Sequence, residues 1–522
     1  MVLQHISSIF AALLVSVFLL AFPVGGYEVI DEFKYNLFLL LSGGYCVLII
    51  IKRVQLAITG IRPFGSVAGG IRGIPAAMKL LLLFLLITII SAVFSVYPGT
   101  FRGEFRREGV LTIAIYIFNC FFLSKYIRPK KWLILLFGGC TVIFCVLSLI
   151  QLTGANPLGL FPKGYNFYSS REHFSGGFLG TIGNAGLVGA FLSIAAGVLS
   201  MSLIKCDFSK NRFFATTVVS LFLVMLLIFE MDIEAALLAA AIGLVLMLPV
   251  AVTGQQSLFR ALFVFAIVIS AFSISRVIVF GDGNTMLDLM GLHLLFAAGF
   301  LVFLGVVVSR INVFEKIPAK WYRAGAACVV ALFLCFAIIY LWFFGSGHTG
   351  MIYEASEILR GRWDDTFGST RIYIWRNVLL GITRWGLLLG TGPDTLGFWN
   401  IELFPRYIPE FGIMLVAQID AAHNEYLQIL ATGGLLSLIS YLGALVLVAV
   451  NWFRFPDNRL SAVAGAGVLF YCIQAFFSIS MFITAPFFWA CLAVLIYSQS
   501  VQMDEETEIW IRTVTMKGEY KF

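Results

Sequence analysis

The sequence predicts an all-α, polytopic helical membrane protein with about 12–14 transmembrane helices. Its 522 residues have a mean hydropathy of +0.96, and only 12% of them are charged. Apolar runs of about twenty residues recur along the whole chain, and each is long enough to cross a bilayer as a helix. The runs are continuous in Leu, Ile, Val, Phe and Ala, which favours helices over the alternating strands of a membrane barrel.

The apolar runs predict fourteen spans in chain order. The first run has no preceding basic cluster and no small-residue cleavage pattern, so we expect it to be retained as a span rather than removed as a signal peptide. The predicted spans are residues 6–24, 35–51, 78–97, 110–125, 132–152, 177–204, 213–230, 233–252, 259–280, 287–308, 322–344, 424–450, 461–480 and 483–500.

Basic residues gather in alternate loops between the spans. Nineteen Lys and Arg, against three acidic residues, occupy the loops 52–79, 125–131, 205–212, 253–260, 309–323 and 451–460. This asymmetry is the positive-inside pattern, which predicts that both termini are cytoplasmic and that the long segment 344–422 is extracytoplasmic. Topology therefore accounts for the net charge of +7, and we expect no nucleic-acid partner.

The predicted topology divides the chain into four parts. We expect a transmembrane bundle of about eleven spans over 1–343, an extracytoplasmic loop with amphipathic helices over 344–422, C-terminal spans over 423–500 and a cytoplasmic tail over 501–522. Eight of the nine cysteines fall inside apolar runs and no CxxC pattern occurs, so we expect neither disulfides nor a cysteine metal site.

The stretch 344–435 is the long region that cannot be a row of spans. It holds six arginines and two histidines, and the outward loops 97–109 and 152–176 can reach it. Within it, apolar residues recur at helical spacing between arginines, which predicts an amphipathic helix lying on the membrane surface. The apolar positions of this helix are Ile372, Trp375, Val378, Leu379 and Ile382.

His423 is the candidate catalytic residue, because it stands at the outer mouth of a predicted span. A neutral imidazole there can take a proton from a hydroxyl group at neutral pH. Asn424 and Glu425 follow it directly and could orient the ring. The simpler alternative is a histidine that only caps the helix end.

Arginines on the outer side are the second functional signal, since topology does not require positive charge there. Guanidinium groups bind diphosphate oxygens in a bidentate way. The candidates are Arg171, Arg371, Arg376 and Arg406, and we rank Arg102, Arg106 and Arg107 below them. Their alternative role is pairing with lipid headgroups or with Glu172, Asp364 or Glu410.

The segment GTGPDTLGF offers further candidates, because Gly390 and Gly392 could let backbone amides approach an anion near Asp394. It matches no Walker pattern. The Asp364–Asp365 pair lacks a further outward carboxylate cluster, so we expect no metal site and no cofactor. Asp232 and Glu234 are unusual charges near the membrane boundary that could face a cavity.

Three stretches, in this order, resemble the O-antigen ligase and O-antigen polymerase superfamily of bacterial membrane glycosyltransferases. They are Arg171 with the following GGFLGTIGNAGLVGAFLS, then STRIYIWRNVLLGI with LLGTGPDTLGF, and then AHNEYLQILATGGLLSLISYLG. The R-x3-W helix and the H-N pair are the most specific of these elements. Hydropathy extends the resemblance to the whole chain.

The resemblance implies a fold like that of C-type glycosyltransferases and a metal-independent transfer at the outer face of the bacterial inner membrane. The donor would be a glycan on undecaprenyl diphosphate, and the acceptor a hydroxyl group of a glycan, a lipid or a protein. In family terms His423 looks like the base that activates the acceptor, and Arg371 like the arginine that binds the donor diphosphate.

The sequence departs from the family pattern at two places. Thr432-Gly433-Gly434 stands where Glu-x-Gly is common, and the segment 231–235 reads MDIEA where many members have a Ser-Arg-Gly-like element. Arg171 would then have to supply the missing charge, or the donor is held differently. A protein-directed oligosaccharyltransferase of the same superfamily, a lipid-linked glycan transporter or flippase, and a structural scaffold remain as alternatives.

Overall fold

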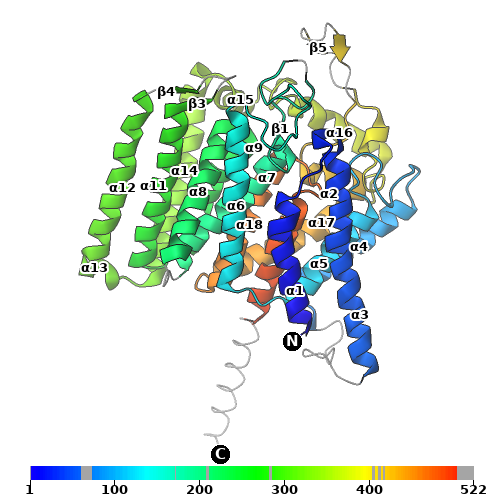
Figure 1. Cartoon of the computed structure of the whole chain (residues 1–522), viewed down its shortest axis with the longest axis horizontal. Helices are drawn as coiled ribbons and strands as arrows, with labels where there is room; N and C mark the ends of the chain where they lie inside the picture. The colour runs from blue at the N-terminus through cyan, green and yellow to red at the C-terminus, as the bar shows by residue number, and fades with distance from the viewer. Residues whose placement is uncertain are drawn as a thin grey trace, which may run out of the picture.

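The computed structural model is a bundle of helices, most of which run along a common direction, up or down (Figure 1). It describes residues 2–59, 73–170, 172–206, 211–280, 285–287, 289–402, 406–408, 413–415 and 418–501. One end of the bundle carries the β-hairpins and α15, and we call it the hairpin end. The chain begins at the opposite end, which we call the terminal end (Figure 1).

Helices account for most of the described chain. In the first half they are α1 (Val2–Leu13), α2 (Ile30–Phe38), α3 (Gly44–Ile58), α4 (Ala76–Val93), α5 (Val110–Tyr126), α6 (Lys131–Leu152), α7 (Ala185–Lys205), α8 (Asn211–Met231), α9 (Glu234–Leu246), α10 (Leu248–Ala251) and α11 (Gln255–Val277). In the second half they are α12 (His293–Arg310), α13 (Asn312–Glu315), α14 (Ala319–Phe344), α15 (Met351–Leu359), α16 (Arg371–Trp385), α17 (Glu425–Arg454), α18 (Arg459–Gln474) and a final helix, Ala485–Val501.

Short elements complete the described chain. The π-helical turns Leu14–Phe18 and Leu39–Gly43 follow α1 and α2. The strands form antiparallel pairs at the hairpin end, which are β1 (Phe178–Leu179) with β2 (Gly183–Asn184), β3 (Ile278–Phe280) with β4 (Thr285–Leu287), and β5 (Arg406–Ile408) with β6 (Ile413–Leu415).

The predicted fold class is confirmed: the protein is an all-α, multi-pass membrane protein. Ten helices in the described part of the chain have the length and apolar composition to cross a membrane, and four shorter apolar helices accompany them. Each of the fourteen predicted runs overlaps one of these helices. The run expected to begin at residue 177 starts as helix only at Ala185, because Gly180 and Gly183 take positive φ angles of 59° and 91° in the β1–β2 hairpin.

Helix α7 is the centre of the bundle. Its residues from Leu187 to Lys205 are all buried, and it packs against α8, α9, α11 and α18. The crossing with α18 is close, since a Cβ atom on Gly197 would lie 2.5 Å from the carbonyl oxygen of Ala466. Small residues at such crossings let helix backbones approach one another in a membrane protein.

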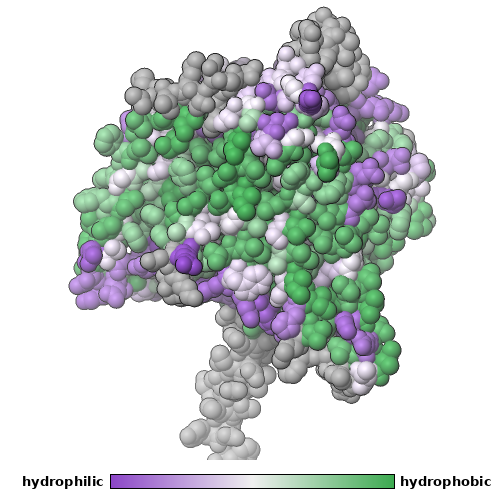
Figure 2. Space-filling view, viewed as in Figure 1, coloured by the Kyte–Doolittle hydropathy of each residue, from purple (hydrophilic) through white to green (hydrophobic). Residues whose placement is uncertain are grey.

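Helix α12 is the leftmost helix of the bundle in Figure 1, and α14 appears to the right of α11. Their large apolar side chains are exposed, as at Phe296 and Phe336. Figure 2 shows a continuous hydrophobic band around the middle of the visible face, with hydrophilic residues gathered toward its ends. Contact with lipid explains this distribution, because an aqueous surface does not favour so large an apolar area.

Helix α17 is broken at Gly434, where φ is 79° and ψ is 177°. Only glycine adopts this backbone conformation readily. The loop 387–392 fills the break. The amide of Leu435 donates to the carbonyl of Leu387 at 2.8 Å, and the amide of Gly392 donates to the carbonyl of Thr432 at 2.8 Å. The break therefore fixes the start of α17, which follows His423, against the loop 387–392.

Candidate active site

His423 lies at the hairpin end, immediately before α17. The side-chain oxygen of Asn424 accepts a hydrogen bond of 3.0 Å from the amide of Leu427 and caps the helix. His423 itself has a positive φ of 48°, an uncommon conformation for a residue with a side chain. Such strain at a half-buried histidine indicates that the surrounding structure holds the ring in a defined place.

Trp375 connects the predicted amphipathic helix to His423. The indole Nε1 donates a hydrogen bond of 3.0 Å to the carbonyl oxygen of Ala422, the residue before the histidine. The ring packs against Phe476 and Phe477. The R-x3-W spacing places Arg371 one turn before this anchor on the same side of α16, so one hydrogen bond registers the helix of Arg371 against the segment of His423.

The apolar face of α16 matches the expected face except at one position. Ile372, Val378 and Ile382 are buried. The expectation for Leu379 was wrong, because this side chain is 51% exposed and Ile374 is buried instead. Ile374 is buried because it lies on the side of α16 that packs against the rest of the protein. The residues on that side include Leu396, Ile419 and Ala431.

Arg371 begins α16 after a strained turn. Gly368, Ser369 and Thr370 all have positive φ angles. The turn is held because the amide of Gly368 donates to Glu354 at 2.8 Å, while Nη1 of Arg371 donates to the carbonyl of Gly368 at 2.7 Å. These bonds set the direction of the Arg371 guanidinium.

Glu234 is the counter-ion of Arg371. Its Oε2 lies 3.9 Å from Arg371 Nη1, and the Glu234 side chain is 40% exposed. Burial lowers the pKa of Arg371, and the carboxylates of Glu234 and Glu354 oppose that shift. The MDIEA segment, where many family members would carry an arginine, thus places an acid beside the diphosphate-binding candidate.

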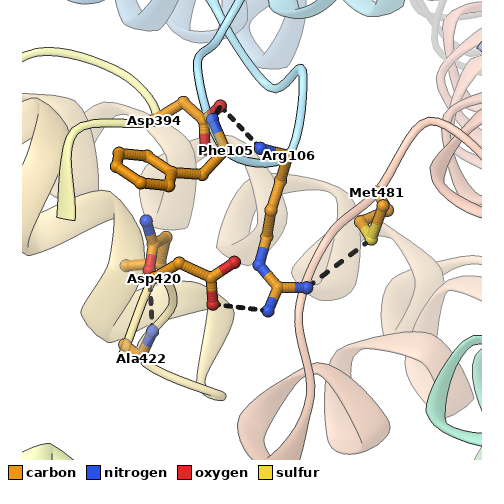
Figure 3. A network of polar contacts seen from close by, with 7 residues as sticks. Phe105, Arg106, Asp394, Asp420, Ala422 and Met481 are labelled. Atoms are coloured by element: carbon orange, nitrogen blue, oxygen red, sulfur yellow. Dashed lines mark hydrogen bonds and ion pairs between the residues drawn. The ribbon is translucent and has the colours of Figure 1, made fainter. Parts of the chain in front are cut away.

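Arg106 enters the same site from the loop between α4 and α5. Oδ2 of Asp394 accepts hydrogen bonds from the amides of Phe105 at 3.0 Å and Arg106 at 2.8 Å, which anchors this loop (Figure 3). The guanidinium then reaches Oδ1 of Asp420 at 2.6 Å, and its other Nη approaches the sulfur of Met481 at 3.8 Å (Figure 3). Asp420 lies three residues before His423.

The two arginines and the histidine form one electrostatic unit. The pKa of His423 is lowered to about 4, mainly by burial and also by the positive charges of Arg106 and Arg371, while Asp420 partly opposes them. Both guanidinium groups are therefore close enough to act on the imidazole. At neutral pH the ring carries no charge, which is the form that can accept a proton.

Asp394 and Glu425 make contacts that hold neighbouring segments of the chain together. The pKa of Asp394 is raised to about 6, because the effect of burial outweighs the opposing effect of its hydrogen bonds from the amides of Arg106 and Phe105. Glu425 accepts hydrogen bonds from the hydroxyl groups of Tyr441 at 2.7 Å and Tyr471 at 2.8 Å. In the structure Asn424 caps α17 and Glu425 joins it to α18, and the orientation of the imidazole by these two residues stays a prediction.

A cavity of about 90 Å³ lies beside Arg106. Glu108, Asp394 and Glu425 contribute carboxyl groups to its lining. Burial raises the pKa of Glu108 well above its usual range, and the nearby Asp394 and Glu425 raise it further. A volume of this size is large enough for several water molecules.

The remaining arginine candidates are Arg376, Arg406 and Arg171. Arg376 forms an exposed ion pair of 2.6 Å with Asp365, so that member of the Asp364–Asp365 pair already has a cationic partner. Arg406 lies on β5, which projects from the hairpin end in Figure 1, and its side chain is outside the described residues. Arg171 is also outside the described residues.

Gly390 and Gly392 serve close backbone packing. A Cβ on Gly390 would lie 2.5 Å from the carbonyl of Thr432, and one on Gly392 would lie 2.8 Å from the side chain of Ser95. Both have positive φ angles. The glycines therefore let the loop approach the break in α17 and the end of α4.

Sequence reasoning ranked Arg106 too low. The signal was present, because the loop FRGEFRREG carries three arginines on the side where topology does not require them. Choosing among them needs the fold: Arg102 is exposed, and the guanidinium of Arg107 lies over the ring of Tyr35. Of these three arginines, Arg106 reaches the His423 segment, through its ion pair with Asp420.

Comparison with known proteins identifies the region that contains this geometry. No curated protein matches the chain. Residues 289–442 match the family model described as O-Antigen ligase, which includes Arg371, Asp394 and His423 but neither Arg106 nor Glu234. The protein is a multi-pass membrane protein whose residues 289–442 match the O-antigen ligase family.

Proposed function

We propose that the protein is a bacterial glycosyltransferase that moves or polymerises a glycan from an undecaprenyl-diphosphate donor onto an acceptor hydroxyl group. The reaction would occur at the outer face of the cytoplasmic membrane, with both termini in the cytoplasm. The proposal is supported by two contacts near His423: the ion pair of Arg106 with Asp420, and the hydrogen bond from Trp375, on the helix of Arg371, to Ala422. The O-antigen ligase match over the same region supports the ligase or polymerase class.

In the proposed reaction the acceptor oxygen attacks the anomeric carbon of the donor sugar. The bond between that carbon and the diphosphate oxygen breaks, and the electron pair leaves with the lipid diphosphate. His423 takes the hydroxyl proton. Arg371 and Arg106 meet the charge that grows on the departing diphosphate, and this kind of electrostatic stabilisation is a large contribution to catalysis in enzymes.

Donor binding also prepares the base. The same two guanidinium groups that lower the pKa of His423 are those that a bound diphosphate would neutralise. With the donor in place, the pKa of the imidazole rises toward its ordinary value near 6.5. A base with a pKa closer to the working pH accepts the proton more readily, so His423 becomes most effective when the donor is present.

Arg106 supplies the second cation in this proposal. The segment at 231–235 lacks the arginine that many relatives would carry, and it holds Glu234 instead. Arg106 comes from a different loop, and its backbone amide is fixed by Asp394. Its ion pair with Asp420 keeps the guanidinium near His423 until a diphosphate competes for it.

The proposal is tested by loss of the gene and its complementation. Without the protein, we expect lipid-linked glycan to accumulate at the outer face of the membrane while the acceptor loses its glycan. His423→Ala and Arg371→Ala should insert into the membrane normally and fail to restore transfer. Accumulation at the inner face would instead support a flippase, and full activity of either variant would remove the proposed mechanism.

A further inference from the structure

Two adjoining cavities lie at the terminal end of the bundle, away from His423. The first is apolar, has a volume of about 290 Å³ and lies between α1, α6, α7, α18 and the final helix. Apolar side chains, including Leu14, Phe137, Val198 and Phe487, make up most of its lining. Basic residues stand at one end of the cavity, namely Lys130, Lys131 and Arg459.

A polar cavity of about 590 Å³ adjoins the apolar one, because Arg459 lines both. Lys205 and Arg260 contribute further positive charge, and Asp457 and Glu315 are the acidic residues of the lining. Nζ of Lys205 donates to the hydroxyl of Thr253 at 2.9 Å, which is a neutral partner that leaves the positive charge in place.

The chain directions place both cavities at the same end. Lys131 is the first residue of α6, Lys205 is the last residue of α7, and Arg459 is the first residue of α18. Helix α17 begins beside His423 and spans the bundle before α18 starts, so Arg459 and His423 lie at opposite ends. An undecaprenyl-diphosphate donor bound at His423 therefore does not place its phosphates at Arg459.

We propose that the two cavities together bind an anionic glycerophospholipid. The apolar cavity takes part of an acyl chain, and the phosphate of the headgroup lies among Lys130, Lys131 and Arg459. Five basic residues against two acidic residues around the paired cavities favour a negatively charged headgroup over a zwitterionic one. Charge and apolar volume together select an amphiphile, and neither a free anion nor an uncharged lipid satisfies both.

The bound lipid contacts helices that are far apart in the sequence and stabilises their packing. The apolar cavity joins residues of the first helix, Ala11 among them, to Ala490 of the final helix. A ligand that binds the folded bundle but not the unfolded chain stabilises the folded state by mass action. Delipidation should therefore lower the thermal stability of the purified protein.

The test uses the full-length protein purified in detergent, with native mass spectrometry and thermal unfolding as readouts. Phosphatidylglycerol, phosphatidylethanolamine and undecaprenyl phosphate are added separately. We expect phosphatidylglycerol to bind most tightly and to raise the unfolding temperature. Equal binding of phosphatidylethanolamine, or preferred binding of undecaprenyl phosphate, would overturn the proposal.

Two variants separate the headgroup from the acyl chain. The triple variant Lys130→Gln, Lys131→Gln and Arg459→Gln should weaken phosphatidylglycerol binding on the order of a hundredfold, given the contribution of each basic residue near a membrane surface. Val198→Phe should fill the apolar cavity and also weaken binding while the basic residues stay intact. Lys52→Gln, which removes a half-buried lysine outside both cavities, should bind as the wild type does.

Unchanged binding in both the triple variant and Val198→Phe would contradict the proposed site. If the triple variant fails to fold, the comparison of Val198→Phe with Lys52→Gln decides the question. Glycan transfer does not enter either readout, so the lipid site and the proposed function are tested separately.

Discussion

The indole of Trp375 donates a hydrogen bond of 3.0 Å to the carbonyl of Ala422, the residue that precedes His423. This bond joins the helix that begins with Arg371 to the segment that carries the proposed base. It gives the R-x3-W spacing a physical reason, since the tryptophan fixes the distance between the diphosphate-binding candidate and the histidine.

Trp375→Phe should lower kcat/KM about tenfold, because it keeps most of the ring packing but removes a neutral hydrogen bond and loosens the alignment of the reacting groups. The amount of protein in the membrane should stay the same. Glycan transfer in membrane vesicles measures the effect. Trp363→Phe is the control, because Trp363 is 63% exposed, and equal rates for both variants would show that the bond to Ala422 is not needed.

Arg106→Ala should reduce kcat by about 10²–10³-fold, the range typical for removal of one group that stabilises charge in a transition state. Arg106→Lys should recover part of the rate, since lysine keeps the charge without the bidentate fork. Arg102→Ala provides the matched control in the same loop, because Arg102 is exposed. If Arg102→Ala loses activity and Arg106→Ala does not, Arg102 rather than Arg106 stabilises the charge of the leaving diphosphate.

Asp394→Leu should impair transfer through the position of Arg106. The substitution removes the acceptor for the amides of Phe105 and Arg106 and leaves two buried donors unsatisfied. Asp394→Asn should be milder, because an amide oxygen can still accept those bonds. Donor KM and kcat, measured for both variants, should change in the same direction as in Arg106→Ala, and normal kinetics in Asp394→Leu would contradict the anchoring role.

The pH dependence should differ between kcat/KM and kcat. A lowered pKa means that His423 of the free enzyme stays neutral, and so active, as the pH falls toward about 4. The acidic limb of kcat/KM should therefore lie near that value, whereas the acidic limb of kcat should lie at higher pH because the bound diphosphate offsets the two arginines. Coincident limbs would exclude this coupling, and Arg106→Ala should shift the limb of kcat/KM upward.

Glu234→Gln tests the counter-ion of Arg371. Removing the carboxylate should free the guanidinium for the donor and lower the donor KM several-fold with little change in kcat, since an exposed pair contributes about 1 kcal/mol or less. A raised KM would mean instead that Glu234 positions Arg371. Glu32→Gln, an exposed acid on α2, serves as the control.

Composition and hydropathy alone determined the membrane architecture of this protein. Burial of apolar helices in lipid depends on the local run of residues, so each predicted span could be read from its own twenty or so positions. The sequence also indicated the candidates His423 and Arg371 and the amphipathic helix over 371–385. A polar residue beside a span and a helical repeat are both local patterns. The prediction for Leu379 was wrong because the face of a helix that becomes buried depends on the segments that pack against it, which the local pattern does not contain.

Tertiary structure alone decided which distant groups meet. Arg106 is more than three hundred residues from His423 in the sequence, and its place follows from the Asp394 carboxylate and the Asp420 ion pair. The pairing of Glu234 with Arg371 and the packing of Gly390 against the break at Gly434 are likewise long-range contacts. Such contacts arise from the packing of whole helices, and no pattern within one segment encodes them.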